Sequence, residues 1–164
     1  MLDVPDCQLS RDEVIARNLA VVEAHFHNEH PDRIDEALRL YTDDIVWEGP
    51  SRGQVYLDAA TVRRSYLDIF ATIKVHKFVT LRRFATERYV FDDQISDETI
   101  VGDPAKMPNL PYPRGTRMST RLTHLFEMRD GKIAREIAYE IWRRRGSPED
   151  NDLIPAGATV VSFD

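Results

Sequence analysis

Residues 119–144 read STRLTHLFEMRDGKIAREIAYEIWRR, and this stretch decides the fold. Alternate residues before Asp130 are apolar, which is typical of a strand with one buried face. Arg129-Asp130-Gly131 then has the chemistry of a tight turn, since aspartate and glycine tolerate the backbone conformations of hairpin loops. The stretch therefore predicts two antiparallel strands, at residues 117–128 and 132–144.

Ionisable side chains fall on the buried face of this hairpin. A three-residue loop at Arg129–Gly131 places His124 opposite Glu136, with Cβ atoms about 5 Å apart. A two-residue Asp-Gly loop instead pairs Arg129 with Lys132 and sets His124 opposite Ile137. We favour the three-residue loop because it keeps the polar and aromatic residues on one face. That face carries His124, Glu136, Ala138, Glu140 and Trp142.

Composition places the chain among globular proteins. Its 164 residues are 42% hydrophobic and 30% charged, which suits one domain at residues 1–145 and a polar tail at 146–164. A net charge of −6 argues against nucleic acid or an anionic membrane as partner. The single cysteine, Cys7, excludes an intrachain disulfide and a thiolate metal cluster. Without a secretory leader or a membrane-spanning run, we expect a cytoplasmic protein.

Helices are expected in the first half of the chain. Ser10 and Glu13 form a capping box that predicts a helix start, and His25 lies at one edge of its apolar stripe. A second, short helix is expected at residues 34–41, and Asp58 is the expected N-cap of a third. His25, His27 and His30 lack the i, i+4 spacing of a zinc site, so no metal is expected.

Strand patterns dominate the second half. A short strand at residues 45–48 is followed by strands at 75–85 and 88–101 and by the hairpin. Helices followed by antiparallel strands indicate an α+β fold. The expected architecture is a conical α+β barrel, with about three N-terminal helices packed on a curved, mostly antiparallel sheet.

Two motifs resemble a known family. The chain reads LRLYTDDIVWEGP after the second helix and NLPYPRGTRMSTRLTHLFEMRDGKIARE toward its end. In this order they make residues 12–145 similar to the nuclear transport factor 2-like (cystatin-like) superfamily, and within it to the SnoaL-like polyketide cyclases. The resemblance implies a conical pocket for a small hydrophobic molecule, chemistry without a cofactor, and a homodimer. Other members of this fold only bind or assemble, so fold alone does not settle function.

The resemblance also implies roles for particular residues. His124 matches the acid–base aspartate of the cyclases, and Asp103 is the nearest counterpart of their histidine, as though acid and imidazole had been exchanged. His25 matches the oxyanion tyrosine of ketosteroid isomerases. Gly49 stands where those isomerases have their base aspartate, which argues against steroid isomerisation, although Glu48 lies beside it.

These residues predict acid–base chemistry on a carbonyl compound. An imidazole with a pKa near 6.5 can accept and donate protons at neutral pH, so His124 is the expected base. Glu136 or Asp103 would orient it, and His25 would steady an enolate oxygen. Expected substrate contacts are Glu48, Trp47, Tyr66, Phe126, Glu140 and Trp142. The alternative is a non-catalytic ligand-binding or dimerisation module in which these groups only build the pocket.

Overall fold

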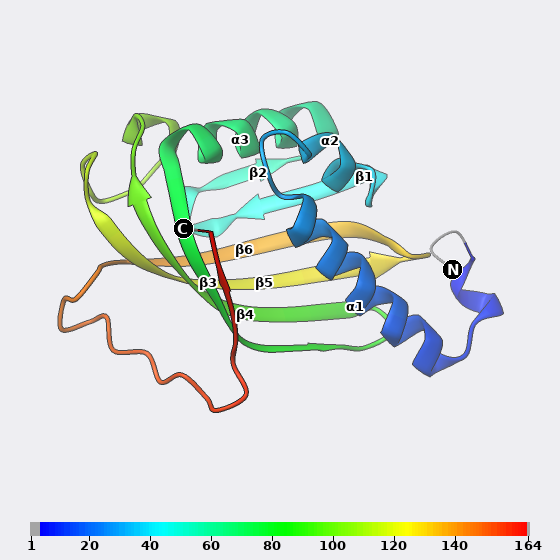
Figure 1. Cartoon of the computed structure of the whole chain (residues 1–164). Helices are drawn as coiled ribbons and strands as arrows, with labels where there is room; N and C mark the ends of the chain where they lie inside the picture. Colours follow the sequence, from blue (N-terminus) through cyan, green and yellow to red (C-terminus); the bar gives the residue numbers. More distant parts are fainter. Residues whose placement is uncertain (1–3, 164) are drawn as a thin grey trace.

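A computed structural model describes residues 4–163 of the chain. Three helices lie on a curved seven-stranded sheet, the expected α+β fold (Figure 1). The sheet order is β2-β1-β6-β5-β4-β3-β7. The helices are α1 (Arg11–Asn28), α2 (Ile34–Leu38) and α3 (Ala59–Thr72). The strands are β1 (Tyr41–Gly49), β2 (Gln54–Tyr56), β3 (Ile73–Ala85), β4 (Tyr89–Ile100), β5 (Arg117–Arg129), β6 (Lys132–Arg144) and β7 (Thr159–Ser162).

The first helix begins where the capping box predicts. The Ser10 side chain accepts from the Glu13 N–H, and the Glu13 carboxylate accepts from the Ser10 N–H at 2.8 Å. Asp58 caps α3 in the same way, accepting from the Thr61 N–H at 2.8 Å. These caps fix the starts of the two helices that cover the sheet. None of the described helices is long and apolar enough to span a membrane.

The region around Tyr41 differs from the prediction. Helix α2 ends at Leu38, and Tyr41 opens β1 instead of closing the helix. Strand β1 runs parallel to β6, with Tyr41 beside Ile133, and it is longer than the predicted strand at 45–48. Pairing with β6 outweighs the local helical pattern, because it buries the Tyr41 ring in the core. Consequently the Tyr41 hydroxyl points into the interior.

The β5–β6 hairpin has a two-residue loop, so the predicted three-residue loop is wrong. Arg129 pairs with Lys132, and Asp130 and Gly131 have φ angles of 47° and 77°. A type I′ turn needs positive φ at both central residues, which an Asp-Gly pair supplies at low cost. This turn fits the twist of the two long strands.

A β-bulge follows the turn and restores the predicted faces. The register shifts by one residue there, so that Ala134 has no partner on β5. His124 therefore faces Ala138, and the predicted pairing of His124 with Glu136 is wrong. Because the turn and the bulge each shift the register by one residue, His124 and Glu136 still share the concave face.

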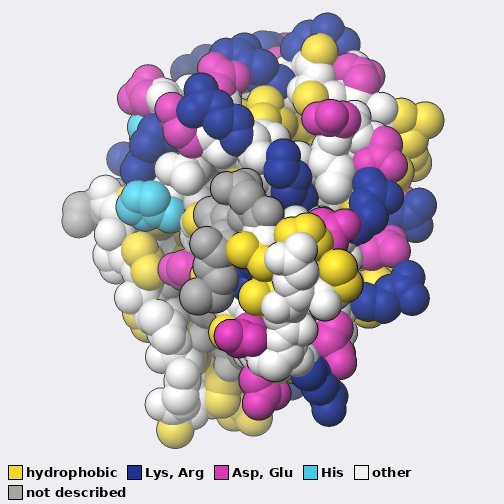
Figure 2. Space-filling view, turned by 90° about the vertical axis from the view of Figure 1, so that its right-hand side faces the viewer, with side chains coloured by type: hydrophobic (Ala, Val, Ile, Leu, Met, Phe, Trp, Pro, Cys, Tyr) yellow, Lys and Arg dark blue, Asp and Glu magenta, His cyan; other side chains and the backbone are white. Residues whose placement is uncertain are grey.

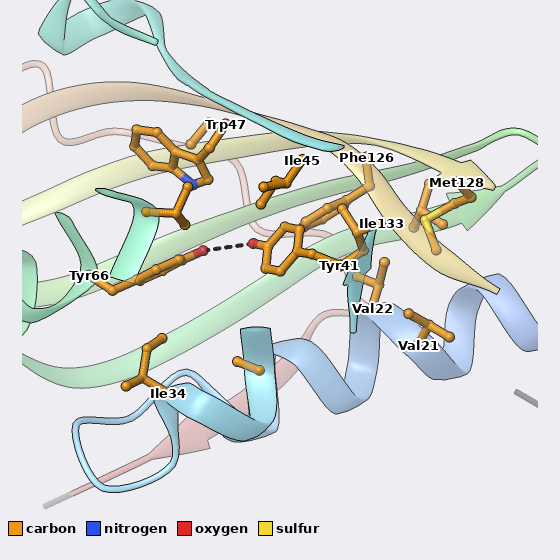
Figure 3. Packing of buried hydrophobic residues seen from close by; sticks show 14 residues of the cluster. Val21, Val22, Ile34, Tyr41, Ile45, Trp47, Tyr66, Phe126, Met128 and Ile133 are labelled. Carbon is orange, nitrogen blue, oxygen red and sulfur yellow. Dashed lines mark hydrogen bonds between the residues drawn. The ribbon is translucent and has the colours of Figure 1, made fainter. Parts of the chain in front are cut away.

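The main core lies between this face and the helices. Tyr41, Trp47, Tyr66 and Phe126 bring aromatic rings from β1, α3 and β5 together (Figure 3). Valines of α1 and isoleucines of β1 and β6 fill the space around them. The core is thus aromatic on the sheet side and aliphatic beneath α1.

The segment after β6 crosses the outer face of the sheet before it forms β7 (Figure 1). Asp152 pairs with Arg121 at 2.8 Å and with Arg143 at 2.5 Å, so it is held on the β5 and β6 strands. On the end of the molecule seen in Figure 2, described side chains of both charge signs are interspersed. The described side chains on this end therefore form no broad field of one sign.

Replacing Gly102 by alanine should destabilise the fold. A Cβ there would lie 2.0 Å from the Ala71 carbonyl oxygen, and the Gly102 N–H donates to the Thr72 carbonyl at 3.1 Å. We expect a loss of roughly 1–3 kcal/mol in the free energy of unfolding, measured by urea denaturation. Gly157→Ala is the control, because no atom lies within 4 Å of its added Cβ. Equal stability of the two variants would contradict this account.

Candidate functional site

A cavity of about 860 Å³ lies between the helices and the concave face of the sheet. This volume suits a small organic ligand. Most of its wall is apolar, with contributions from the end of α1, from α3 and from β3. Its ionisable lining includes Glu29, Arg52, Glu98, His124, Glu136 and Glu140.

Glu136 is the centre of a buried polar cluster. Its carboxylate accepts hydrogen bonds from the Tyr41 hydroxyl and from the Tyr66 hydroxyl, the latter at 3.1 Å. The two hydroxyls are 3.2 Å apart and face each other across the core (Figure 3). His25 Nε2 lies 3.7 Å from the same carboxylate. Four elements, α1, α3, β1 and β6, thus meet at a single carboxylate.

His124 lies beside this cluster on β5 and lines the cavity. Its Nε2 is 4.0 Å from Glu136 Oε1, and its Nδ1 is 3.7 Å from Asp92 Oδ2. Burial lowers the pKa of His124, but the Asp92 and Glu136 carboxylates outweigh burial and raise that pKa above its ordinary value. The imidazole is therefore held between two carboxylates and is stabilised in its charged form.

Asp92 is in position to orient the His124 imidazole, the role that the sequence predicted for Glu136 or Asp103. It faces His124 across the β4–β5 pair and is fully buried. Arg83 Nε donates to Oδ1 at 2.6 Å, and the Gln94 amide donates to Oδ2 at 2.7 Å. Burial raises the pKa of Asp92, but His124 and Arg83 outweigh it and lower that pKa below its usual range. Asp92 is thus a fixed carboxylate behind the imidazole.

His25 is buried in the cluster but is not among the residues that line the cavity. Its Nε2 lies 3.3 Å from the Tyr66 hydroxyl and 3.5 Å from the Tyr41 hydroxyl. Burial lowers the pKa of His25, and the nearby His124 lowers it further, against the opposing effect of Glu136. A neutral His25 behind the tyrosines differs from the predicted oxyanion donor in contact with the ligand.

Two carboxyl groups of the cavity lining have pKa values that are raised to near neutral pH. Burial, reinforced by Glu136, raises the pKa of Glu29 to about 8. Burial also raises the pKa of Glu98 to about 7, although Thr120 donates to it and Ser96 Oγ donates at 2.9 Å. Among residues 4–163, neither carboxyl forms an ion pair with an arginine or a lysine. A protonated carboxyl at neutral pH can donate a hydrogen bond to a ligand.

Another wall of the cavity is fixed by an ion pair. Arg52 donates to Glu140 through Nε at 2.8 Å and through Nη2 at 2.5 Å, in a two-point contact between buried groups. The guanidinium lies 5.7 Å from the centre of the Trp47 ring. Within the described part of the chain, the buried Trp47 Nε1–H has no hydrogen-bond partner. Trp47 and Tyr66 line the cavity, as does Glu140.

Besides His25, four of the predicted site residues lie away from the cavity lining. Asp103 is exposed and caps a short 3₁₀ helix by accepting from the Ala105 N–H at 3.0 Å. Glu48 pairs with Arg135 at 3.4 Å, next to the inward-pointing Trp47. Phe126 is fully buried in the core, and Trp142 is half-buried. The structure therefore brings together His124, Glu136, Trp47, Tyr66 and Glu140, but not these four.

The site residues predicted from the sequence did not include Asp92, Glu29 and Arg52. Asp92 and Glu98 belong to an alternating polar series on β4, Asp-x-Gln-x-Ser-x-Glu, that faces the concave side. Only Ile95 is apolar among residues 92–98, so the sequence shows no alternation that would mark the inward face of β4. Glu29 follows the last helical residue and Arg52 lies in a short 3₁₀ helix, where periodicity carries no signal.

Comparison with solved structures finds the same fold. A candidate polyketide cyclase from Silicibacter sp. TM1040 superposes with a TM-score of 0.64 at 16% identity, covering 77% of this chain and 90% of that one. A nuclear transport factor 2-like protein from Burkholderia xenovorans gives 0.61 at 10% identity, covering 77% and 91%. An LEH-like epoxide hydrolase from M. tuberculosis gives 0.58 at 16% identity, covering 77% and 84%.

The comparison with curated proteins found no match. Among protein families, the model of the SnoaL-like domain matches residues 8–136. This range includes the three helices, β1 to β5 and the polar cluster up to Glu136. The chain has the same fold as the nuclear transport factor 2-like protein, and it belongs to the SnoaL-like domain family.

Proposed function

We propose that the protein is a small acid–base enzyme that acts, without a cofactor, on a hydrophobic carbonyl compound by an isomerisation or an intramolecular aldol cyclisation. One observation carries the proposal: His124 lines a ligand-sized cavity and is held between the Asp92 and Glu136 carboxylates. General bases must first reach the substrate and then have a suitable pKa. The place of His124 in the cavity lining supports the first condition, and in this proposal its two neighbours control the second.

In the proposed reaction, neutral His124 removes a proton from the carbon next to the carbonyl. Asp92 stabilises the imidazolium that forms, as a positioning residue without substrate contact. In an isomerisation the imidazolium returns the proton to another carbon of the enolate. In a cyclisation the enolate carbon attacks a second carbonyl of the same molecule, and the proton goes to the new alkoxide.

The enolate oxygen needs a donor in the cavity. His25 lies behind the tyrosines, whereas the Glu29 carboxyl lines the cavity with its pKa raised by burial to about 8. A neutral carboxyl at pH 7 can donate to a developing oxyanion in a water-poor site. Glu29 is the donor in this proposal.

Replacing His124 by alanine should abolish turnover. Loss of a positioned base lowers kcat by about 10²- to 10⁴-fold, measured on a panel of β-keto esters and enones. His30→Ala is the control, since His30 is exposed at the cavity rim. Equal rates for wild type and His124→Ala would remove His124 from the mechanism. Ligand binding without turnover in either protein would favour the binding-module alternative.

The rate should rise with pH through the raised pKa of His124. The imidazole acts as a base only when deprotonated, so kcat/KM should increase as pH rises above 6.5. Asp92→Asn removes one stabilising carboxylate and should move this limb to lower pH, by about one unit. NMR titration of ¹³C-labelled His124 measures the same pKa without a substrate. An unchanged midpoint in Asp92→Asn would contradict the assigned role of Asp92.

Two substitutions of Glu29 test whether its side chain acts as a hydrogen-bond donor. Glu29→Gln keeps a donor of similar size and should retain most of kcat, whereas Glu29→Ala should lower kcat by roughly 10²-fold. The activity that depends on the protonated carboxyl should fall above pH 8 in wild type but not in Glu29→Gln. Identical kinetics in the two variants would exclude Glu29 as the donor.

The homodimer and the cytoplasmic location stay predictions. We propose pairing through the outer sheet face, where Tyr139 and Ile141 of β6 are exposed. Ile141→Asp should then shift the mass in solution, measured by light scattering, from two chains to one. A single-chain mass for the wild type would rule out the dimer.

A further inference from the structure

Strand β7 adds a wall to the cavity. It pairs antiparallel with β3, with Val161 opposite Phe78 and Val160 opposite Val79. In Figure 1 the last strand runs along β3 at the open side of the sheet. This segment lies beyond residue 136, where the match to the SnoaL-like family ends. β7 is therefore an addition to the part of the fold that the family model describes.

Side chains of β7 alternate between the cavity and the outside. Val161 and Phe163 line the cavity together with Phe78, and the rings of Phe78 and Phe163 meet edge to face with centres 5.9 Å apart. Val161 is 48% exposed and Phe163 59% exposed. Val160 is exposed but is not part of the lining. Two apolar side chains thus present open surface to an unfilled space.

The lining of the cavity is more apolar near β7 and more polar near β5 and β6. The first half of the β3 lining contains Ile73, Val75 and Phe78, and the end of α3 adds Ile69 and Phe70. The second half of β3 contributes Thr80, Arg82 and Arg83 to the lining, away from this apolar part. Beyond β3, the lining of β4 to β6 contains carboxyls and the His124 imidazole. The cavity therefore has an apolar end at β7 and a polar end at β5 and β6. Such a site fits a molecule with one polar and one apolar end.

We infer that Val161 of β7 and Phe163, which directly follows β7, bind the apolar end of the ligand together with Phe78 and make the protein select elongated molecules with a carbonyl head and a hydrophobic tail. Three strand spacings separate β7 from β5, about 14 Å along the sheet. A tail of that length reaches β7 when the carbonyl is at His124. The position of the reactive end rests on the function proposed above, whereas binding of the apolar end does not.

The affinity should depend on tail length in a defined way. Each methylene that leaves water for an apolar wall improves binding by up to about four-fold. Alkyl phenyl ketones from acetophenone to dodecanophenone are the probes, since they keep the head and lengthen the tail to about the 14 Å that separates β5 from β7. Isothermal titration with wild type should give a dissociation constant that falls along the series. The short members end before β7 and should not sense it.

The decisive variant is Val161→Ser combined with Phe163→Ser. We expect it to weaken dodecanophenone binding about ten-fold or more and to change acetophenone binding less than two-fold. Val160→Ser, on the opposite side of the same strand, is the matched control and should bind the whole series as wild type does. Both residues of the double variant are exposed, and thermal unfolding checks that the fold is kept.

Several results would overturn the inference. These are no binding by wild type, an affinity independent of tail length, equal binding by wild type and the double variant, or equal losses in the double variant and Val160→Ser. His124→Ala separates the two proposals because it should lose turnover while the affinity still rises with tail length. Length-dependent binding with no turnover in any variant would end the enzyme proposal and leave the role of β7 standing.

Discussion

The carboxylate of Glu136 is the group on which the interior of this protein depends. A charged oxygen pair removed from water must be matched by donors, and here the donors come from Tyr41 on β1 and Tyr66 on α3. His25 of α1 and His124 of β5 close the shell around it. Packing of these elements is therefore specified by hydrogen bonds as well as by apolar contact. Breaking one part leaves a buried charge without its partners.

The groups around Glu136 shift the pKa values of two histidines in opposite directions, although the two imidazoles are chemically identical. His25 has its pKa lowered, by burial first, while His124 has its pKa raised because Asp92 and Glu136 outweigh burial. Neighbouring titratable groups pushed in opposite directions are characteristic of acid–base sites. The difference follows from position: His124 has a carboxylate on either side, and His25 has one carboxylate and two tyrosines.

The sequence predicted the fold class, the helix caps and the long strands because each depends on local signals. Capping at Ser10 needs only a few adjacent residues. A tight turn at Asp130-Gly131 was indicated in the same local way, although its loop has two residues and three were predicted. Strand register was predicted less well. The face that His124 shares with Glu136 was predicted correctly, but the residue opposite His124 was not. The bulge at Ala134 changes this register, and it is decided by the whole sheet. Tyr41 shows the same effect, as contact with β6 outweighs its helical pattern.

The candidate site was predictable only where the resemblance or the alternation of strands reached it. His124 was found by both, whereas Asp92 lies on a strand 32 positions earlier in the chain and is joined to it by pairing alone. Glu29 and Arg52 lie at element ends, where no periodic pattern exists. Asp103 was assigned by alignment across a proline-rich loop, and in the structure it serves that loop as a cap.

The pairing of β7 with β3 affects whether other protein chains can add a strand to this edge of the sheet. Strand β3 is 13 residues long, and without β7 its outer edge would offer unpaired backbone groups to any other extended segment. The four residues of β7 occupy the middle of that edge, at Lys77–Thr80, and leave only short stretches on either side. The tail thereby makes the edge a poor template for intermolecular strand addition, so that solubility at high concentration depends on the last residues of the chain.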